Sequence, residues 1–157
     1  MYNSSTFVSK PDATVAYAIV RVAFGLAMFM HGLARFIAGI EKYATPTIAG
    51  FANVALPHGL VVFSVYAIPC AELLIGMFVL FGFLTRLGIM GSALLMLVLI
   101  FGTAMEQNWA VLAIQLNYVL VIALLYLGLD LNTFCVDSYL GLGSQMPPET
   151  HGATRYA

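Results

Sequence analysis

The stretch from Leu60 to Phe83 is uncharged over its whole length except for one carboxylate, Glu72, near its middle. About 20 apolar residues are enough for a helix to cross the ~30 Å hydrocarbon core of a bilayer, so this stretch predicts a membrane span. A carboxylate at that depth costs roughly 2.5–3.5 kcal/mol on insertion scales. A helix keeps such a group only beside a partner, a proton or water. Glu72 is therefore the first candidate for chemistry or binding inside a membrane.

The composition extends this conclusion to the whole chain. Hydrophobic residues make up 62% of the 157 residues and charged residues only 8%, against about 45–50% and 25% in soluble domains. The sequence therefore predicts an integral membrane protein in contact with the lipid bilayer. Its length leaves room for one bundle and short tails, so a soluble redox domain would belong to another chain. The net charge of −1 argues against a nucleic-acid partner, which requires clustered Lys and Arg.

Four apolar segments are separated by polar joins, and each predicts a helix because open strands leave backbone groups unsatisfied in lipid. The predicted spans are residues 14–33, 60–83, 87–105 and 109–129. The two short joins force antiparallel neighbours. We therefore expect an all-α fold, an integral membrane four-helix antiparallel bundle over residues 14–130. The N-terminal tail (1–13) and the C-terminal extension (131–157) are expected to lie outside it, the latter loosely ordered because it has no long periodic run.

The long connection between the first two spans contains a further helical pattern. Thr45-Pro46 is a plausible helix start, apolar residues follow at helical spacing, and Pro57 ends the pattern. We expect a short interfacial helix over residues 46–54.

An even number of spans places both termini on one side of the membrane. Cytoplasmic sides carry an excess of Lys and Arg, and four basic residues on the terminal side against two on the other favour cytoplasmic termini in a cell membrane. The four are Lys10, Arg21, Arg86 and Arg155, and the two are Arg35 and Lys42.

One face of the first span combines basic residues with small ones. Its members follow three- to four-residue spacing: Arg21, Gly25, Met28, Gly32 and Arg35. His31 lies about 80° from this face, by the ~100° step per residue. Gly25 and Gly32 allow another helix or a flat ligand to approach closely, and helix packing is the favoured interpretation.

Counting 1.5 Å per residue from the terminal side places Arg21 roughly 10 Å and Glu72 roughly 16 Å deep. We therefore predict an internal Arg21–Glu72 pair, with a snorkelling Arg21 as the alternative. His31 is expected to act as a donor or proton relay, or else as an ordinary interfacial histidine. Gln115 and Asn117 point about 200° apart, so at most one faces Glu72 and the other bonds a neighbouring helix.

Four motifs occur in order along the chain: Arg21 with Gly25; His31-Gly32 followed by Arg35; Ala71-Glu72 followed by Gly76; and the turn Gly82-Phe83-Leu84-Thr85-Arg86. Together they resemble the DoxX/DoxD family of four-helix membrane proteins, over residues 15–130. DoxD-like chains are similar to the small subunit of thiosulfate:quinone oxidoreductase, and DoxX-like chains occur in membrane complexes linked to redox stress. The resemblance implies a catalytic role for Glu72 and His31 and a ligand-binding role for Arg21, Arg35, Gly25 and Gly32, with Arg86 as a further candidate.

The leading hypothesis is a quinone-interacting subunit of a multi-chain oxidoreductase, with other protein subunits as partners. A quinone site needs an apolar slot, a donor such as His31 and a proton acceptor such as Glu72. The alternatives are a non-catalytic scaffold or assembly subunit and, third, a small-solute transporter or channel. No paired transmembrane histidines, cysteine cluster or nucleotide-binding loop occur in the sequence, so neither metal nor nucleotide is expected, and a haem with His31 as its single ligand is the weaker alternative. Cys70 and Cys135 lie at different depths and are expected to be free thiols.

Overall fold

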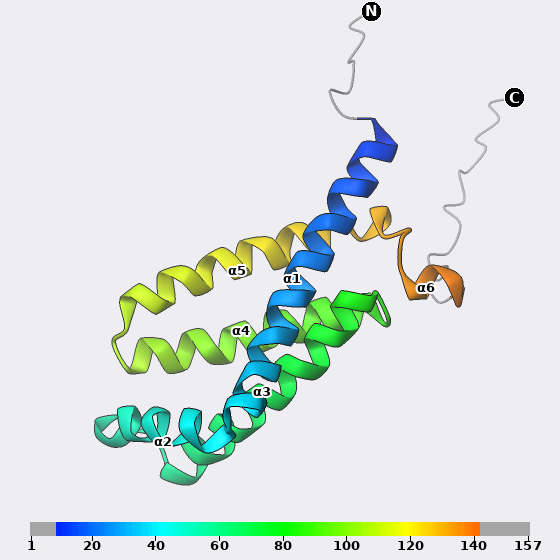
Figure 1. The fold of residues 1–157 in the computed structure, drawn as a ribbon. Helices are drawn as coiled ribbons and strands as arrows, with labels where there is room; N and C mark the ends of the chain where they lie inside the picture. The colour runs from blue at the N-terminus through cyan, green and yellow to red at the C-terminus, as the bar shows by residue number, and fades with distance from the viewer. Residues whose placement is uncertain (1–8, 142–157) are drawn as a thin grey trace, which may run out of the picture.

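The computed structural model describes residues 9–141 of the chain, and within this range it contains helices and no strand. Four of the helices are long and apolar enough to cross a membrane, which confirms the predicted all-α membrane bundle (Figure 1). These helices are α1 (Lys10–Ala38), α3 (His58–Phe81), α4 (Thr85–Met105) and α5 (Trp109–Leu127). Arg155, which entered the charge count, lies outside the described residues.

The first span is longer at both ends than the apolar pattern predicted. Ser9 accepts a hydrogen bond from the backbone N–H of Asp12, so α1 begins at Lys10 rather than near residue 14. At the other end the helix continues to Ala38 and stops at Gly39, whose φ of +95° suits glycine. The 29 residues give a length of about 43 Å, more than the ~30 Å hydrocarbon core. The two polar ends of α1 therefore extend beyond the apolar part of a bilayer.

The closest packing in the bundle joins α1 to α3, which lie side by side along most of their length (Figure 1). A Cβ added at Gly25 would lie 2.4 Å from the backbone nitrogen of Leu80, and one at Gly76 would lie 2.3 Å from that of Phe29. Gly32 likewise meets the backbone of α3. Small residues at such crossings let two backbones approach within membranes. The packing interpretation of these glycines is therefore confirmed.

The hairpin of α4 and α5 completes the bundle beside α1 and α3. Gln115 on α5 donates to the Thr103 hydroxyl on α4 at 2.9 Å, so of the two mid-span amides it is Gln115 that bonds a neighbouring helix inside the chain. The buried apolar core is contributed by all four spans: Tyr17, Phe24, Met28, Val79, Ile89, Leu95, Met96, Ile122 and Leu125.

The connection between the first two spans forms α2 (Ile40–Gly50) and the short η1 (Phe51–Asn53). The predicted start at Thr45-Pro46 was wrong, because the helix begins at Ile40 and Pro46 lies inside it. The buried residue Ala44 precedes Pro46 and packs on α3, and this contact offsets the backbone hydrogen bond that a proline removes. Tyr66 of α3 also donates to the Glu41 carboxylate at 3.0 Å. These contacts hold α2 against the α3 end of the bundle.

The segment after α5 was predicted to be a loose extension, and this was wrong for residues 130–141. Here η2 (Leu129–Leu131) and α6 (Val136–Tyr139) pack against the turn between α3 and α4. Asn132 donates from Nδ2 to the Thr85 hydroxyl at 3.0 Å. Pro147 and Pro148, which also suggested looseness, lie outside the described residues.

Asp137 makes three further hydrogen bonds from this segment, and its side chain is buried. Its carboxylate accepts hydrogen bonds from Leu84 N at 2.6 Å, Thr85 N at 2.7 Å and the Thr85 hydroxyl at 2.7 Å. Leu84, at the N-cap of α4, makes no side-chain cap, so an aspartate from the far end of the chain caps the helix instead. A negative charge also suits a helix N-terminus electrostatically.

Candidate functional site

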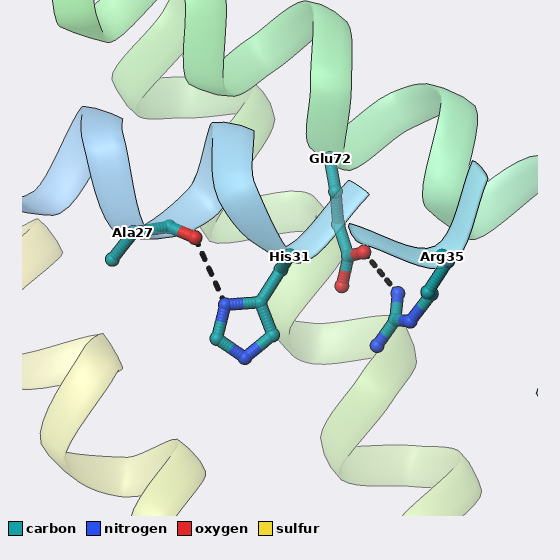
Figure 2. A network of polar contacts seen from close by, with 4 residues as sticks. All are labelled: Ala27, His31, Arg35 and Glu72. Atoms are coloured by element: carbon teal, nitrogen blue, oxygen red, sulfur yellow. Dashed lines mark hydrogen bonds and ion pairs between the residues drawn. The ribbon is translucent and has the colours of Figure 1, made fainter. Parts of the chain in front are cut away.

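The deep carboxylate of Glu72 forms an ion pair across the α1–α3 interface. Arg35 donates to Glu72 from Nη1, and the two side chains are 22% and 4% exposed (Figure 2). The Arg35 guanidinium also lies 4.3 Å from the centroid of the Tyr43 ring in α2, a cation–π contact. Burial raises the pKa of the Tyr43 phenol, and the Arg35 charge opposes the shift, so the ring stays neutral at physiological pH. Three elements thus converge on one buried carboxylate.

His31 lies one turn before Arg35 on α1, and its ring is exposed at the surface of the bundle. Its Nδ1 lies 2.9 Å from the carbonyl oxygen of Ala27. A carbonyl only accepts, so Nδ1 carries the hydrogen, and Nε2 of the neutral ring is an acceptor with no hydrogen bond within residues 9–141. The ring forms a T-shaped pair with Tyr118 of α5, with centroids 6.5 Å apart. Figure 2 shows the Glu72 carboxylate between the His31 ring and the Arg35 guanidinium, within electrostatic reach of both.

The predicted Arg21–Glu72 pair was wrong. Arg21 is buried and donates to three carbonyls, those of Val79 at 2.8 Å, Leu80 at 3.2 Å and Phe134 at 2.7 Å. The last carbonyls of a helix have no partner inside it, and those of α3 lie roughly 10 Å beyond Glu72 along the helix. Arg21 therefore satisfies the C-terminus of α3, and Glu72 finds its cation at the other end of α1.

The other predicted residues are distributed differently. Gly25 and Gly32 share a face with Arg35, but the backbone of α3 fills the space beside them. Their close approach is made by a helix, so a ligand would meet His31 or Arg35 instead. Arg86 is exposed and makes no hydrogen bond or ion pair within residues 9–141.

Sequence reasoning missed two aromatic members of the site, Tyr43 and Tyr118. Tyr43 lies on the helix whose start was predicted too late, and the missed residues 40–45 carry the ring under Arg35. Tyr118 comes directly after Asn117 in α5. On this span only the amides Gln115 and Asn117 were considered, so the tyrosine was not included. An aromatic ring is one of the partners that an arginine can take in an apolar chain, and the nearness of Tyr43 to Arg35 in the sequence was the available signal.

An apolar groove lies elsewhere on the surface, between α1 and the segment after α5. Val15, Ile19, Val22 and Phe134 are among its lining residues, and the lining contributed by the described part of the chain is apolar. Such a groove suits a lipid chain but offers nothing to orient a reacting head group. Within residues 9–141 no three His, Cys, Asp or Glu side chains gather as metal ligands, and Cys70 and Cys135 are free thiols.

The DoxX family profile matches residues 16–105, more than half of the chain. This chain belongs to the DoxX family. The matched region includes His31, Arg35 and Glu72, and ends before α5. No curated protein and no solved structure matches the chain. Family membership and the four apolar helices make it a multi-pass membrane protein, and DoxX proteins are often tied to redox or quinone-related complexes.

Proposed function

We propose that this chain is the quinone-interacting membrane subunit of a multi-chain redox complex, and that the cluster of His31, Glu72 and Arg35 is where it meets the quinone head group. One observation carries the proposal: an exposed imidazole lies beside a buried, ion-paired carboxylate in a membrane bundle. Ionisable groups inside a membrane bundle are costly to keep, and they commonly mark ligand or proton pathways.

The residues fit the chemistry of such a ligand. A quinone takes up two electrons and two protons on reduction, and the quinol releases them on oxidation. The free Nε2 of His31 accepts a proton from a hydroxyl, and the protonated ring donates one to a carbonyl. Glu72 offsets the charge that His31 carries after accepting a proton, and Arg35 keeps the carboxylate compensated between transfers. The fixed Nδ1 contact with Ala27 orients the ring throughout.

In this proposal the electrons come from a partner subunit. The basic-residue count favours a cell membrane with both termini in the cytoplasm, which puts His31 and Arg35 near the outer surface. Asn53, exposed in η1, tests this orientation. A cysteine at that position should react with a membrane-impermeant reagent in intact cells, and labelling only after lysis would invert the topology.

A non-catalytic scaffold remains the second candidate, and the Arg35–Glu72 pair itself favours it. The pair joins two helices that already pack closely through Gly25, Gly32 and Gly76. A purely structural pair would have the same geometry. The two functions differ in the role of the exposed His31 ring: the quinone-interacting subunit needs it for binding and proton exchange, and the scaffold does not.

The test is purification of the chain in its native lipid, followed by analysis of co-isolated proteins and extraction of bound quinone. His31→Ala should reduce the retained quinone about tenfold, the effect of losing roughly 1.4 kcal/mol of binding. His58→Ala is the matched control, because His58 is also exposed but begins α3, far along the helix from Glu72. Glu72→Gln should keep partner subunits and lose turnover. Co-purified partners without quinone in the wild-type protein would favour the scaffold.

A further inference from the structure

The polar side chain of Asn117 lies at the middle of α5 and is exposed on the outside of the bundle. Its Nδ2 donates to the Ala113 carbonyl of the same helix at 3.0 Å, and its Oδ1 accepts no hydrogen bond within residues 9–141. In the hydrocarbon region there is no water to complete its bonding. An unpaired amide at this depth is costly, and this cost requires an explanation.

Gln115 on the same helix has a partner for its amide nitrogen, while its buried Oε1 accepts no hydrogen bond within the described residues. Its side chain turns inward and bonds Thr103 of α4, whereas Asn117 turns away from every other helix described. The helix α5 is also the least covered span. Only 17% of its most apolar stretch is buried, against 28%, 28% and 33% in the other three. Within residues 9–141, its outer face therefore has few protein neighbours.

Asn117 is part of a regular pattern on this face. The residues recur in alternating steps of three and four, and all are exposed: Ala110, Ala113, Asn117, Leu120, Leu124 and Leu127. We call this surface the Asn117 stripe. Such spacing is the heptad seam of paired helices, and a single asparagine within a seam fixes its register and the number of strands. Ala110 and Ala113 allow close approach at one end.

We propose that the Asn117 stripe is the interface of a homodimer, in which α5 of one copy packs in parallel against α5 of a second copy. Two copies inserted in the same orientation are related by a two-fold axis along the membrane normal, so each stripe residue meets its own counterpart. An amide both donates and accepts, which makes asparagine complementary to itself at such an axis. The Oδ1 of Asn117 in each copy would accept a hydrogen bond from the Nδ2 of Asn117 in the other copy.

The test measures energy transfer between donor- and acceptor-labelled copies of the full-length chain in phospholipid vesicles, as lipid is added to dilute the protein. Asn117→Ala should raise the dissociation constant of the dimer about tenfold, the size expected for two interhelical hydrogen bonds. Gln115→Ala, which removes the neighbouring amide from the interior, should leave it within about twofold of wild type. Circular dichroism verifies that both variants remain helical.

Disulfide formation locates the interface independently. In a background with Cys70→Ala and Cys135→Ala, Leu124→Cys should cross-link two copies on oxidation, whereas Ala123→Cys, about 100° around the helix, should not. A wild-type chain that stays monomeric at every protein-to-lipid ratio would overturn the proposal, as would an Asn117→Ala protein that dimerises unchanged. Equal cross-linking at the two positions would show random collision and would likewise overturn it.

Discussion

Two arginines on one face of α1, roughly 21 Å apart along the helix, meet different partners at the two ends of the bundle. Arg21 is buried among the carbonyls of Val79, Leu80 and Phe134. Arg35 is partly exposed and pairs with the Glu72 carboxylate beside His31. The first environment is built of neutral acceptors, and the second of groups that gain and lose protons.

This difference separates structure from chemistry within one helix. Backbone carbonyls do not titrate, so the hydrogen bonds that Arg21 donates to them do not depend on pH. They connect α1 to the end of α3 and to the segment after α5. A carboxylate and an imidazole exchange protons, so the Arg35 end retains the means for acid–base work. Both residues are arginines, so the residue type does not show which one is structural and which lies beside titrating groups. That depends on the partner of each side chain.

The largest effect should come from removing Arg35. Arg35→Met leaves Glu72 buried without compensation and should lower the free energy of unfolding by about 3–5 kcal/mol, and adding Glu72→Leu should recover most of this loss. Unfolding in detergent measures both. The matched cycle of Arg21→Met with Glu72→Leu should be additive within about 0.5 kcal/mol. Coupling of Glu72 to Arg21 instead of Arg35 would contradict the observed pairing.

Arg21→Met should lower the free energy of unfolding by about 3 kcal/mol, because it removes charge-assisted hydrogen bonds and leaves buried carbonyls unsatisfied. Arg86→Met is the control at the neighbouring turn. Arg86 is exposed, so its loss should stay within about 0.5 kcal/mol. The quinone retained per folded molecule should be unchanged in Arg21→Met and reduced in Arg35→Met. Equal quinone loss in Arg21→Met and Arg35→Met would show that the Arg21 and Arg35 ends of α1 do not differ in function.

Asp137→Ala should cost about 2 kcal/mol, because it uncaps α4 and leaves the N–H groups of Leu84 and Thr85 without their acceptor. Asp130→Ala is the matched change at an exposed aspartate of the same segment, and it should cost less than about 0.5 kcal/mol. Hydrogen exchange at the first turn of α4 should accelerate only in Asp137→Ala. Unchanged protection there would show that the cap contributes nothing.

The smallest effect concerns the other end of α4, where Glu106 lies at the helix C-terminus, over Gly50 of α2. Burial raises the pKa of the Glu106 carboxyl, so the folded protein holds this proton more firmly than the unfolded chain. Its contribution to stability therefore falls as pH rises from the ordinary value through the raised one. Glu106→Gln should melt slightly higher than wild type at pH 7 and equally at pH 3. A difference in melting temperature between Glu106→Gln and wild type that is the same at pH 3 and pH 7 would refute this prediction.

Much of the fold follows from the sequence because lipid leaves few choices. The apolar lengths locate four helices, the short joins make neighbours antiparallel, and the spacing of Gly25 and Gly32 reveals a packed face. Polar ends are harder to predict. Ser9 and Gly39 set the limits of α1, and both lie outside the apolar pattern.

The partners of the charges were the least predictable part. Depth placed Arg21 and Glu72 at similar levels, but backbone carbonyls compete for an arginine and occur at every position in a sequence. Asp137 resembled an ordinary tail residue, since nothing near it shows that α4 lacks a cap of its own. Glu72 was singled out correctly as a buried carboxylate that requires a partner, while its cation became evident only from the crossing of α1 and α3.

The residue that caps α4 is synthesised later than the helix itself. Asp137 lies 52 positions after Thr85 in the chain, and a ribosome adding about 5–20 residues per second makes it roughly 3–10 s later. Throughout that interval the first turn of α4 has only water or lipid head groups as partners for its N–H groups. The hairpin of α3 and α4 therefore lacks this cap until residue 137 has been made.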